Sequence, residues 1–156
     1  MKLSQPGDAG RVCAVIPTRN RPESLLRLLR SLSEQSHRPE EVIVIDASDE
    51  AGANSRLRGQ FPSLNLRVIT SRPSLSAQRN QGIALADTEF ILLADDDIEF
   101  PPMYIEVLLR YLQEHPVDGA VSGTLREPAN GREFVPDQRA ISAAGLLWAY
   151  VFQTSV

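Results

Sequence analysis

The chain has 156 residues, of which 42% are hydrophobic and 23% charged, and its formal net charge is −4 at pH 7. These values are typical of a globular domain with one core of ordinary size, and they exclude a disordered or fibrous chain. An acidic balance also argues against a polyanion-binding protein, so we expect no nucleic-acid partner.

Neither end of the chain carries a membrane-spanning pattern. Residues 1–10 have no apolar stretch after Lys2 and are predicted to be a flexible tail, neither a signal peptide nor an anchor. The apolar segment 140–152 is too short to span a bilayer, so we expect no transmembrane segment and interpret it as buried or interfacial structure. The single cysteine, Cys13, lies in an apolar run and is expected to be a buried thiol. These features fit the cytoplasm, and a location at the membrane periphery is also open.

Short apolar runs alternate with helical patterns along the chain. The runs cover residues 12–16, 42–45, 66–69 and 90–94, and a weaker fifth run covers residues 120–122. Each is bounded by polar or turn residues, which is typical of strands buried on both faces.

Four helices are predicted between these strands. The first is indicated by leucines at the spacing of one helical face, and Asn20 with Glu23 predicts a capping box at its start. The others are expected over residues 53–60, 74–86 and 101–115, with Gly82 a modest penalty in the second of these. Strands that alternate with helices predict the α/β class, a mostly parallel sheet flanked by helices. Residues 126–139 are rich in turn formers and predict an extended loop or hairpin.

A polar cluster follows each of the first four strands. Ligands bind to open α/β sheets beyond the carboxyl ends of the strands, so we expect the four clusters to converge on one edge of the sheet. In chain order they are Pro17-Thr18-Arg19-Asn20, Asp46-Ala47-Ser48-Asp49, Thr70-Ser71-Arg72-Pro73 and Asp95-Asp96-Asp97.

The run of three aspartates is the sharpest of these signals. Three adjacent carboxylates repel one another unless a cation or hydrogen bonds offset the charge, and Mg²⁺ and Mn²⁺ prefer such oxygen ligands. In an extended backbone Asp95 and Asp97 share one side and Asp96 takes the other, so the first and third are the predicted metal ligands. The alternative is a solvated acidic turn that caps the next helix.

The remaining clusters contain groups suited to a nucleotide. Thr18 and backbone groups near Pro17 can hydrogen-bond a planar base, and Asp46 can accept a hydrogen bond from a ring N–H. A turn residue or helix N-cap is an equally weighted interpretation of Asp46. Residues 76–80 open a helix, where free N–H groups and Arg79 can hold phosphate or ribose oxygens.

On that same helix, Gln78 and Gln81 are interpreted as part of an exposed polar face.

Taken together, these segments resemble a known family. The stretches that carry the resemblance are VCAVIPTRNRPESLLRLLRSLSEQ, EEVIVIDASDE and SAQRNQGIALADTEFILLADDDIEF. They look like the N-terminal half of the family 2 inverting glycosyltransferases, which have the GT-A nucleotide-sugar-binding fold. The resemblance spans about residues 11–125, and residues 126–156 would then be a loop and the start of an acceptor region.

The resemblance implies transfer of a sugar, with inversion, from a nucleoside diphosphate of the UDP, GDP or dTDP type to a hydroxyl of a glycan, lipid or protein acceptor. It implies that Pro17, Thr18 and Arg19 line the base pocket and that Asp46 accepts a hydrogen bond from the base.

The same comparison assigns Arg79 and Asn80 to the ribose or phosphates. It places Asp95 and Asp96 near the ribose and metal, and Asp97 on a divalent cation, Mn²⁺ or Mg²⁺. The ion and an arginine would stabilise charge on the leaving diphosphate.

Two departures from the family pattern leave alternatives open. Ala47 and Ser48 follow Asp46 where many relatives have an acid or asparagine, which leaves the choice of base open. The catalytic base is unknown, because the acidic motif that supplies it in the family lies later than the segments found here. Glu127, Glu133 and Asp137 are candidates without a spacing argument.

The alternative function is therefore a non-catalytic nucleotide-sugar-binding fragment or regulatory module that lacks the base. A nucleotidyltransferase is less favoured, because the sequence contains no glycine-rich loop to hold a triphosphate.

Overall fold

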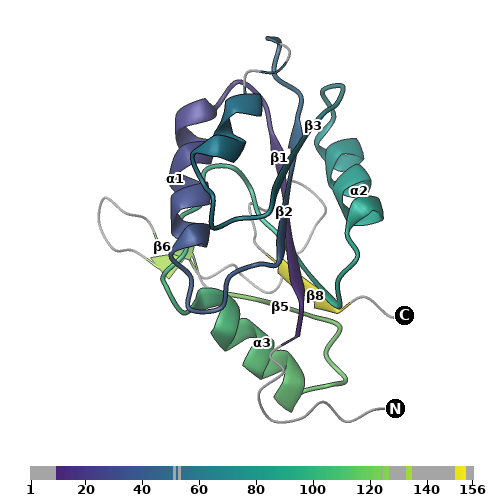
Figure 1. Cartoon of the computed structure of the whole chain (residues 1–156). Helices are drawn as coiled ribbons and strands as arrows, with labels where there is room; N and C mark the ends of the chain where they lie inside the picture. The colour runs from purple at the N-terminus through teal and green to yellow at the C-terminus, as the bar shows by residue number, and fades with distance from the viewer. Residues whose placement is uncertain are drawn as a thin grey trace.

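A parallel sheet forms the centre of the molecule (Figure 1). The computed structural model describes residues 10–50, 52, 54–123, 125–126, 133–134 and 150–153, the last three ranges by their backbone. The first four strands, all parallel, are β1 (Val12–Thr18), β2 (Glu41–Asp46), β3 (Leu66–Thr70) and β4 (Phe90–Leu93). The α/β class predicted from the alternation of strands and helices is confirmed.

The far edge of the sheet is antiparallel. The full strand order is β3-β2-β1-β4-β8-β5, in which β8 (Tyr150–Gln153) lies between β4 and β5 (Ala120–Ser122) and runs against both. The predicted fifth strand is confirmed, but a later segment separates it from β4. Residues 140–149 of the predicted apolar segment lie outside the described residues, as do residues 1–9 of the predicted tail.

Within residues 126–139, a hairpin was one of two expected structures. The short strands β6 (Leu125–Arg126) and β7 (Glu133–Phe134) pair antiparallel, as strands of a hairpin do, and form a separate two-stranded sheet.

The larger core lies on the sheet face that carries α1 (Pro22–Ser33) and α3 (Tyr104–Glu114). Alternate β1 residues, Val12, Ala14 and Ile16, are fully buried against these helices. The predicted apolar faces are confirmed, because all of their members are buried: Leu25, Leu28, Leu29, Leu32, Ile105, Leu108, Leu109 and Leu112. Helix α3 begins three residues after the Pro101 at which the sequence predicted its start.

The opposite face carries α2 (Leu75–Leu85), which lies across the sheet from α1 (Figure 1). Its core is small and consists of Cys13, Val15, Ile43, Ile45 and Ile91.

Gly82 permits the close approach of α2 to β1. A Cβ at this position would lie 2.2 Å from Val15 Cγ1. The glycine therefore has a packing role that outweighs its helix penalty.

Two smaller expectations on the chain can be compared with the structure. The helix expected over residues 53–60 is a short 3₁₀ helix, η1 (Ser55–Gly59). The predicted burial of the Cys13 thiol is confirmed, and burial with the nearby Glu41 carboxylate raises its pKa to about 12. This thiol is therefore unreactive at neutral pH.

No helix within the described residues has the length and apolar character needed to cross a bilayer.

Candidate functional site

The carboxyl ends of four parallel strands meet at one edge of the sheet, as predicted. Thr18 at the end of β1 pairs with Asp46 at the end of β2, and Asp46 pairs in turn with Thr70 at the end of β3. On the other side of β1, the backbone N–H of Ala94 donates to the carbonyl of Val15 at 3.1 Å. Because β4 lies beside β1, the acidic run that follows β4 lies near the loop that follows β1.

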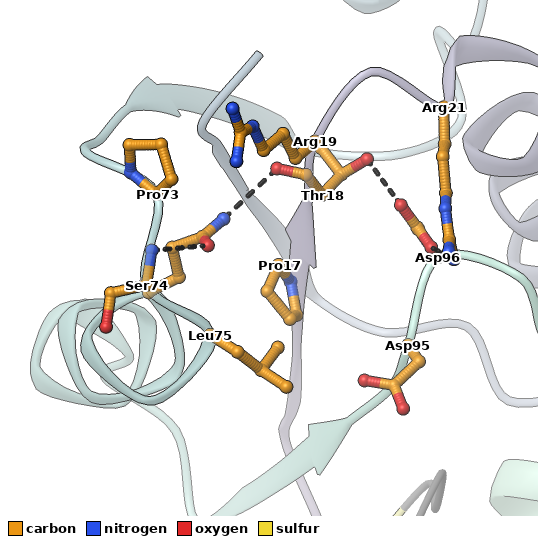
Figure 2. Close-up of a pocket in the computed structure, with 10 residues that line it drawn as sticks. Pro17, Thr18, Arg19, Arg21, Pro73, Ser74, Leu75, Asp95 and Asp96 are labelled. Carbon is orange, nitrogen blue, oxygen red and sulfur yellow. Dashed lines mark hydrogen bonds and ion pairs between the residues drawn. The ribbon is translucent and has the colours of Figure 1, made fainter.

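A pocket of about 550 Å³ opens at this edge (Figure 2). In Figure 2, Pro17 lies between Leu75, which α2 contributes, and the acidic residues that follow β4. Of the residues predicted from the sequence, five line the pocket: Pro17, Thr18, Arg19, Asp95 and Asp96. Four others, Asp46, Arg79, Asn80 and Asp97, are not among its lining residues. Pro73 comes from the third of the predicted clusters, and the sequence reasoning assigned no site role to the remaining four lining residues: Arg21, Ser74, Leu75 and Gln78.

A short polar chain joins the loop after β1 to the acidic run. The Thr18 hydroxyl donates to Asp96 Oδ2 at 2.7 Å, and Arg21 Nη1 donates to Asp96 Oδ1 at 3.3 Å. The same nitrogen donates to Asp97 Oδ2 at 3.0 Å. Both oxygens of the buried Asp96 are thus occupied, and the nearby carboxylates raise the pKa of Arg21, chiefly through Asp96.

Asp95 pairs with a different arginine. Arg79 Nη2, from α2, donates to Asp95 Oδ1 at 2.5 Å, and the Asp95 side chain is 9% exposed. Burial raises the pKa of Asp95, and the neighbouring Asp97 and Asp96 carboxylates add to the rise, while Arg79 opposes it. Burial therefore disfavours the ionised form of Asp95, whereas the ion pair with Arg79 favours it.

The prediction of the metal ligands assumed an extended backbone at the acidic run, and this assumption is wrong. The chain turns at residues 96–97, so Asp96 and Asp97 share a partner in Arg21 while Asp95 contacts Arg79. Of the alternative, a solvated acidic turn that caps the next helix, the turn is present but the cap is wrong, because Met103 is the N-cap residue of α3. Across the part of the chain that the structure describes, no group of three or more His, Cys, Asp or Glu side chains is arranged to hold a metal ion.

A second cluster joins the loops after β1 and β2, and we call its members Arg19, Asn20, Ser48 and Asp49 the loop clasp. Asn20 Nδ2 donates to Asp49 Oδ2 at 2.7 Å, the Asp49 backbone N–H donates to Asn20 Oδ1 at 3.0 Å, and Arg19 Nη2 donates to Asp49 Oδ1 at 3.0 Å. The backbone N–H of Asn20 donates to the Ser48 hydroxyl at 2.9 Å. These contacts hold Arg19 at the rim of the pocket.

The predicted capping box at Asn20 is wrong. Asn20 has a left-handed backbone with φ of 55°, and its side chain faces Asp49. Arg21 is the N-cap residue of α1, without a side-chain capping bond, and Pro22 follows it in the first helical turn. Asparagine tolerates this backbone conformation better than most residues do, which explains its place in the clasp.

Asp46 is held inside the protein. It is 4% exposed, and its two oxygens accept hydrogen bonds from the Ser48 backbone N–H and from Asn54 Nδ2, both at 2.9 Å. These bonds agree with the turn interpretation of Asp46, while its contact with a base stays a prediction.

Gln78 differs from its prediction as an exposed polar residue. It is 4% exposed, and its Nε2 donates to the carbonyls of Thr18 at 3.1 Å and Ile45 at 2.8 Å. Because Gln78 and Gly82 are four residues apart, they share the helix face that contacts the sheet. That spacing is the one sequence signal that could have indicated its burial.

Comparisons with known proteins agree on one family. A family model described as "Glycosyl transferase family 2" matches residues 13–155. The chain is 31% identical over 105 residues to the uncharacterized glycosyltransferase YwdF of Bacillus subtilis, and 31% identical over 104 residues to a hyaluronan synthase of Pasteurella multocida. These alignments cover 66% and 64% of this chain but only 38% and 11% of the relatives, so the chain spans a minor part of their length.

Solved structures give the same result. The S. aureus TarS structure of residues 1–349 in complex with UDP matches with a TM-score of 0.63 and 26% identity, over 81% of this chain and 38% of that chain. The mannosyltransferase PcManGT from Pyrobaculum calidifontis, in complex with GDP-Man and Mn²⁺, matches with a TM-score of 0.62 and 25% identity, over 78% of this chain and 37% of that chain.

Proposed function

The chain belongs to glycosyl transferase family 2 and has the GT-A fold, and on this premise we propose that it binds the donor of an inverting sugar transfer to an acceptor hydroxyl. The donor would be a nucleoside-diphosphate sugar. The observation that carries the proposal is the pocket at the carboxyl ends of the strands, which combines the loop after β1 with the acidic run after β4. Complexes of similar proteins with UDP and with GDP-Man support the donor class.

The base half of the donor is assigned to the loop after β1. Pro17, Thr18 and Arg19 line the pocket there and offer a ring, a hydroxyl and a guanidinium. The buried Asp46 lies in register with Thr18, where its fixed carboxylate would contribute to reading the base. The nucleotide would be of the uridine, guanosine or thymidine type, and the relative affinities of these nucleotides would identify it.

The diphosphate half is assigned to the β4 side. Arg79 holds Asp95 beside the pocket, and Asn80 follows on the exposed side of α2. Asp96 lines the pocket and has both oxygens occupied, so it would present a fixed negative edge.

The carboxylates present fit a divalent cation. Asp95 Oδ2 and Asp97 Oδ1 accept no hydrogen bond within the described residues, and both are hard oxygen donors. Mg²⁺ commonly takes one or two protein carboxylates and completes its shell with water and substrate phosphates. Asp95 and Asp97 would hold the ion, and when bound the ion supplies charge stabilisation to the leaving diphosphate.

Calorimetric titration of the chain with UDP and GDP, with and without Mn²⁺, tests the proposal. We expect one nucleotide to bind in a Mn²⁺-dependent way and Asp97→Ala to remove that dependence. Asp87→Ala is the matched control, because Asp87 is an exposed carboxylate before β4, at the opposite end of that strand. A folded wild-type protein that binds neither UDP nor GDP would contradict the proposed function.

Turnover needs a separate test, because the chain spans a minor part of its relatives. Binding without acceptor-stimulated release of nucleoside diphosphate would favour the non-catalytic module. Release on addition of an acceptor would favour the enzyme.

The proposed acceptor is a hydroxyl group on a glycan, lipid or protein. The proposed location is the cytoplasm, given the unpaired and buried Cys13.

A further inference from the structure

Arg21 contacts two of the three carboxylates in the acidic run through a single nitrogen, Nη1, at 3.0 Å from Asp97 Oδ2 and 3.3 Å from Asp96 Oδ1. Its backbone is fixed, because its carbonyl accepts the hydrogen bond of Leu25 N–H at 3.1 Å in the first turn of α1. Its side chain is 57% exposed, in contrast. The guanidinium can therefore change partners by rotation of the side chain alone.

Arg79, the other arginine of the site, is built in differently. Its side chain is 27% exposed and contacts Asp95, whose side chain is 9% exposed. Moving Arg79 away would leave a buried carboxylate unpaired, which is costly. Moving Arg21 away from Asp97 costs little, because the Asp97 side chain is already 38% exposed. The Asp96 side chain is 7% exposed, and it would lose its arginine but keep the 2.7 Å hydrogen bond from the Thr18 hydroxyl.

A divalent cation on Asp97 would compete with Arg21 for that carboxylate. Two like charges a few ångströms apart oppose each other, and the opposition is larger near a protein surface than in bulk water. An ion that binds Asp97 while the guanidinium stays 3.0 Å from Asp97 Oδ2 meets that opposition. Binding of the ion alone is therefore weakened as long as Arg21 stays in place.

A diphosphate would supply a new partner for Arg21. Arg21 lines the pocket, and its Nη2 and Nε donate no hydrogen bond within the described residues. A guanidinium pairs well with phosphate oxygens through such parallel N–H groups. The donor thus offers an anion at the point where the ion would displace the guanidinium.

We propose that Arg21 exchanges anions: it holds Asp96 and Asp97 in the absence of donor, and turns to the donor's diphosphate when a divalent cation takes Asp97. This inference rests on the proposed function of the pocket. Its consequence is mutual dependence, since the nucleotide strengthens ion binding by the same factor as the ion strengthens nucleotide binding.

The test measures three affinities for each protein: Mn²⁺ alone, from the electron paramagnetic resonance signal of free Mn²⁺; the nucleotide alone; and the nucleotide with saturating Mn²⁺. The nucleotide is whichever of UDP and GDP binds the wild type. The test variant is Arg21→Met, which keeps the length of the side chain and removes its charge. The control is Arg27→Met, because Arg27 lies on the same helix, is 53% exposed and pairs at 3.3 Å with Glu99, which is not a residue of the pocket.

We expect Arg21→Met to bind Mn²⁺ alone about tenfold more tightly and the enhancement of nucleotide affinity by Mn²⁺ to fall by about tenfold, within the usual range of coupling between sites. Arg27→Met should match the wild type in all three. Unchanged Mn²⁺ affinity and unchanged coupling in Arg21→Met would overturn the exchange. Weaker Mn²⁺ binding in that variant would also overturn it, because Arg21 would then orient the carboxylates for the ion.

Two further controls separate the possible failures. If Arg21→Met does not fold by circular dichroism, Arg21→Lys replaces it, because a single ammonium on a shorter reach should hold Asp97 less firmly and shift both quantities in the same direction. A wild-type protein that binds no nucleotide contradicts the proposed function itself, whereas a wild type that binds with coupling unchanged in the variant contradicts only the exchange.

Discussion

The two faces of the sheet differ in what they contribute. The face under α1 and α3 holds most of the buried apolar side chains among the described residues, whereas the face under α2 holds a core of five residues from three strands. Yet α2 and its N-cap supply Ser74, Leu75 and Gln78 to the pocket, and Arg79 to Asp95. Stability is therefore concentrated on one face and the candidate site draws on the other, a division that substitutions can test.

The largest effect is expected on the α1 face. Leu28 is fully buried, and Leu28→Ala should lower the free energy of unfolding by about 2–5 kcal/mol, since it leaves a cavity in the core under α1. Leu85→Ala on α2, where the leucine is 37% exposed, should change it by less than about 0.5 kcal/mol. Urea unfolding measures both changes, and equal losses would contradict the conclusion that stability is concentrated on the α1 face.

A smaller loss is expected where α2 meets β1. Gly82→Ala would place a methyl group 2.2 Å from Val15 Cγ1, and such overpacking costs about 1–3 kcal/mol. Because α2 carries Gln78 and Arg79, nucleotide affinity should fall together with stability. Gly59→Ala is the control, since a Cβ there meets nothing within 4 Å. If Gly82→Ala left both quantities at the Gly59→Ala values, close packing of α2 would have no part in forming the pocket.

Gln78→Leu should cost about 1 kcal/mol, near the lower end for an unpaired buried polar group. The Thr18 carbonyl keeps its bond from the Ala47 N–H at 2.9 Å, so only part of its hydrogen bonding is lost. The larger consequence is for binding, because the ends of β1 and β2 lose their link to α2. Gln81→Leu, on the same helix, should leave nucleotide affinity unchanged. Equal affinities in the two variants would make Gln78 a residue of the fold alone.

The α1 face was predictable from the sequence because its signal is local. Leucines at helical spacing in α1 and apolar residues at the same spacing in α3 fix which sides are buried, and continuous apolar runs mark β1 to β4. The position of the pocket was predictable as well, because it follows from the direction of parallel strands.

What could not be predicted depends on contacts between distant segments. Helix α2 has no apolar face, so only the four-residue spacing from Gln78 to Gly82 indicates that Gln78 is buried. The loop clasp requires that the loops after β1 and β2 meet in a particular register, and Asn20 serves it with a backbone that a capping box excludes. The insertion of β8 between β4 and β5 pairs it with segments about 60 and about 30 residues earlier in the chain, which the sequence of a four-residue strand does not indicate.

The smallest expected effect on stability is that of Asp95→Asn, and at neutral pH it is opposite in sign to the losses described above. The pKa of Asp95 is raised, chiefly by burial, so the native state binds its proton more tightly than the unfolded chain does. Its contribution to stability is therefore present below the unfolded pKa and is lost as pH rises through the folded pKa. Asp95→Asn should match the wild type in acid and be equally or more stable at neutral pH, while Mn²⁺-dependent nucleotide binding is lost.

Asp49 in the loop clasp provides the contrast for that measurement. Hydrogen bonds from Asn20 and Arg19 lower the pKa of Asp49, so its contribution is present above the unfolded pKa and is lost as pH falls through the folded pKa. Asp49→Asn should therefore be less stable than the wild type at neutral pH, with a difference that vanishes in acid. Thermal unfolding of the two variants and the wild type across the acid to neutral range gives both slopes. Slopes of the same sign would mean that Arg79 outweighs the burial of Asp95, and that this carboxylate belongs to the stabilising part of the molecule.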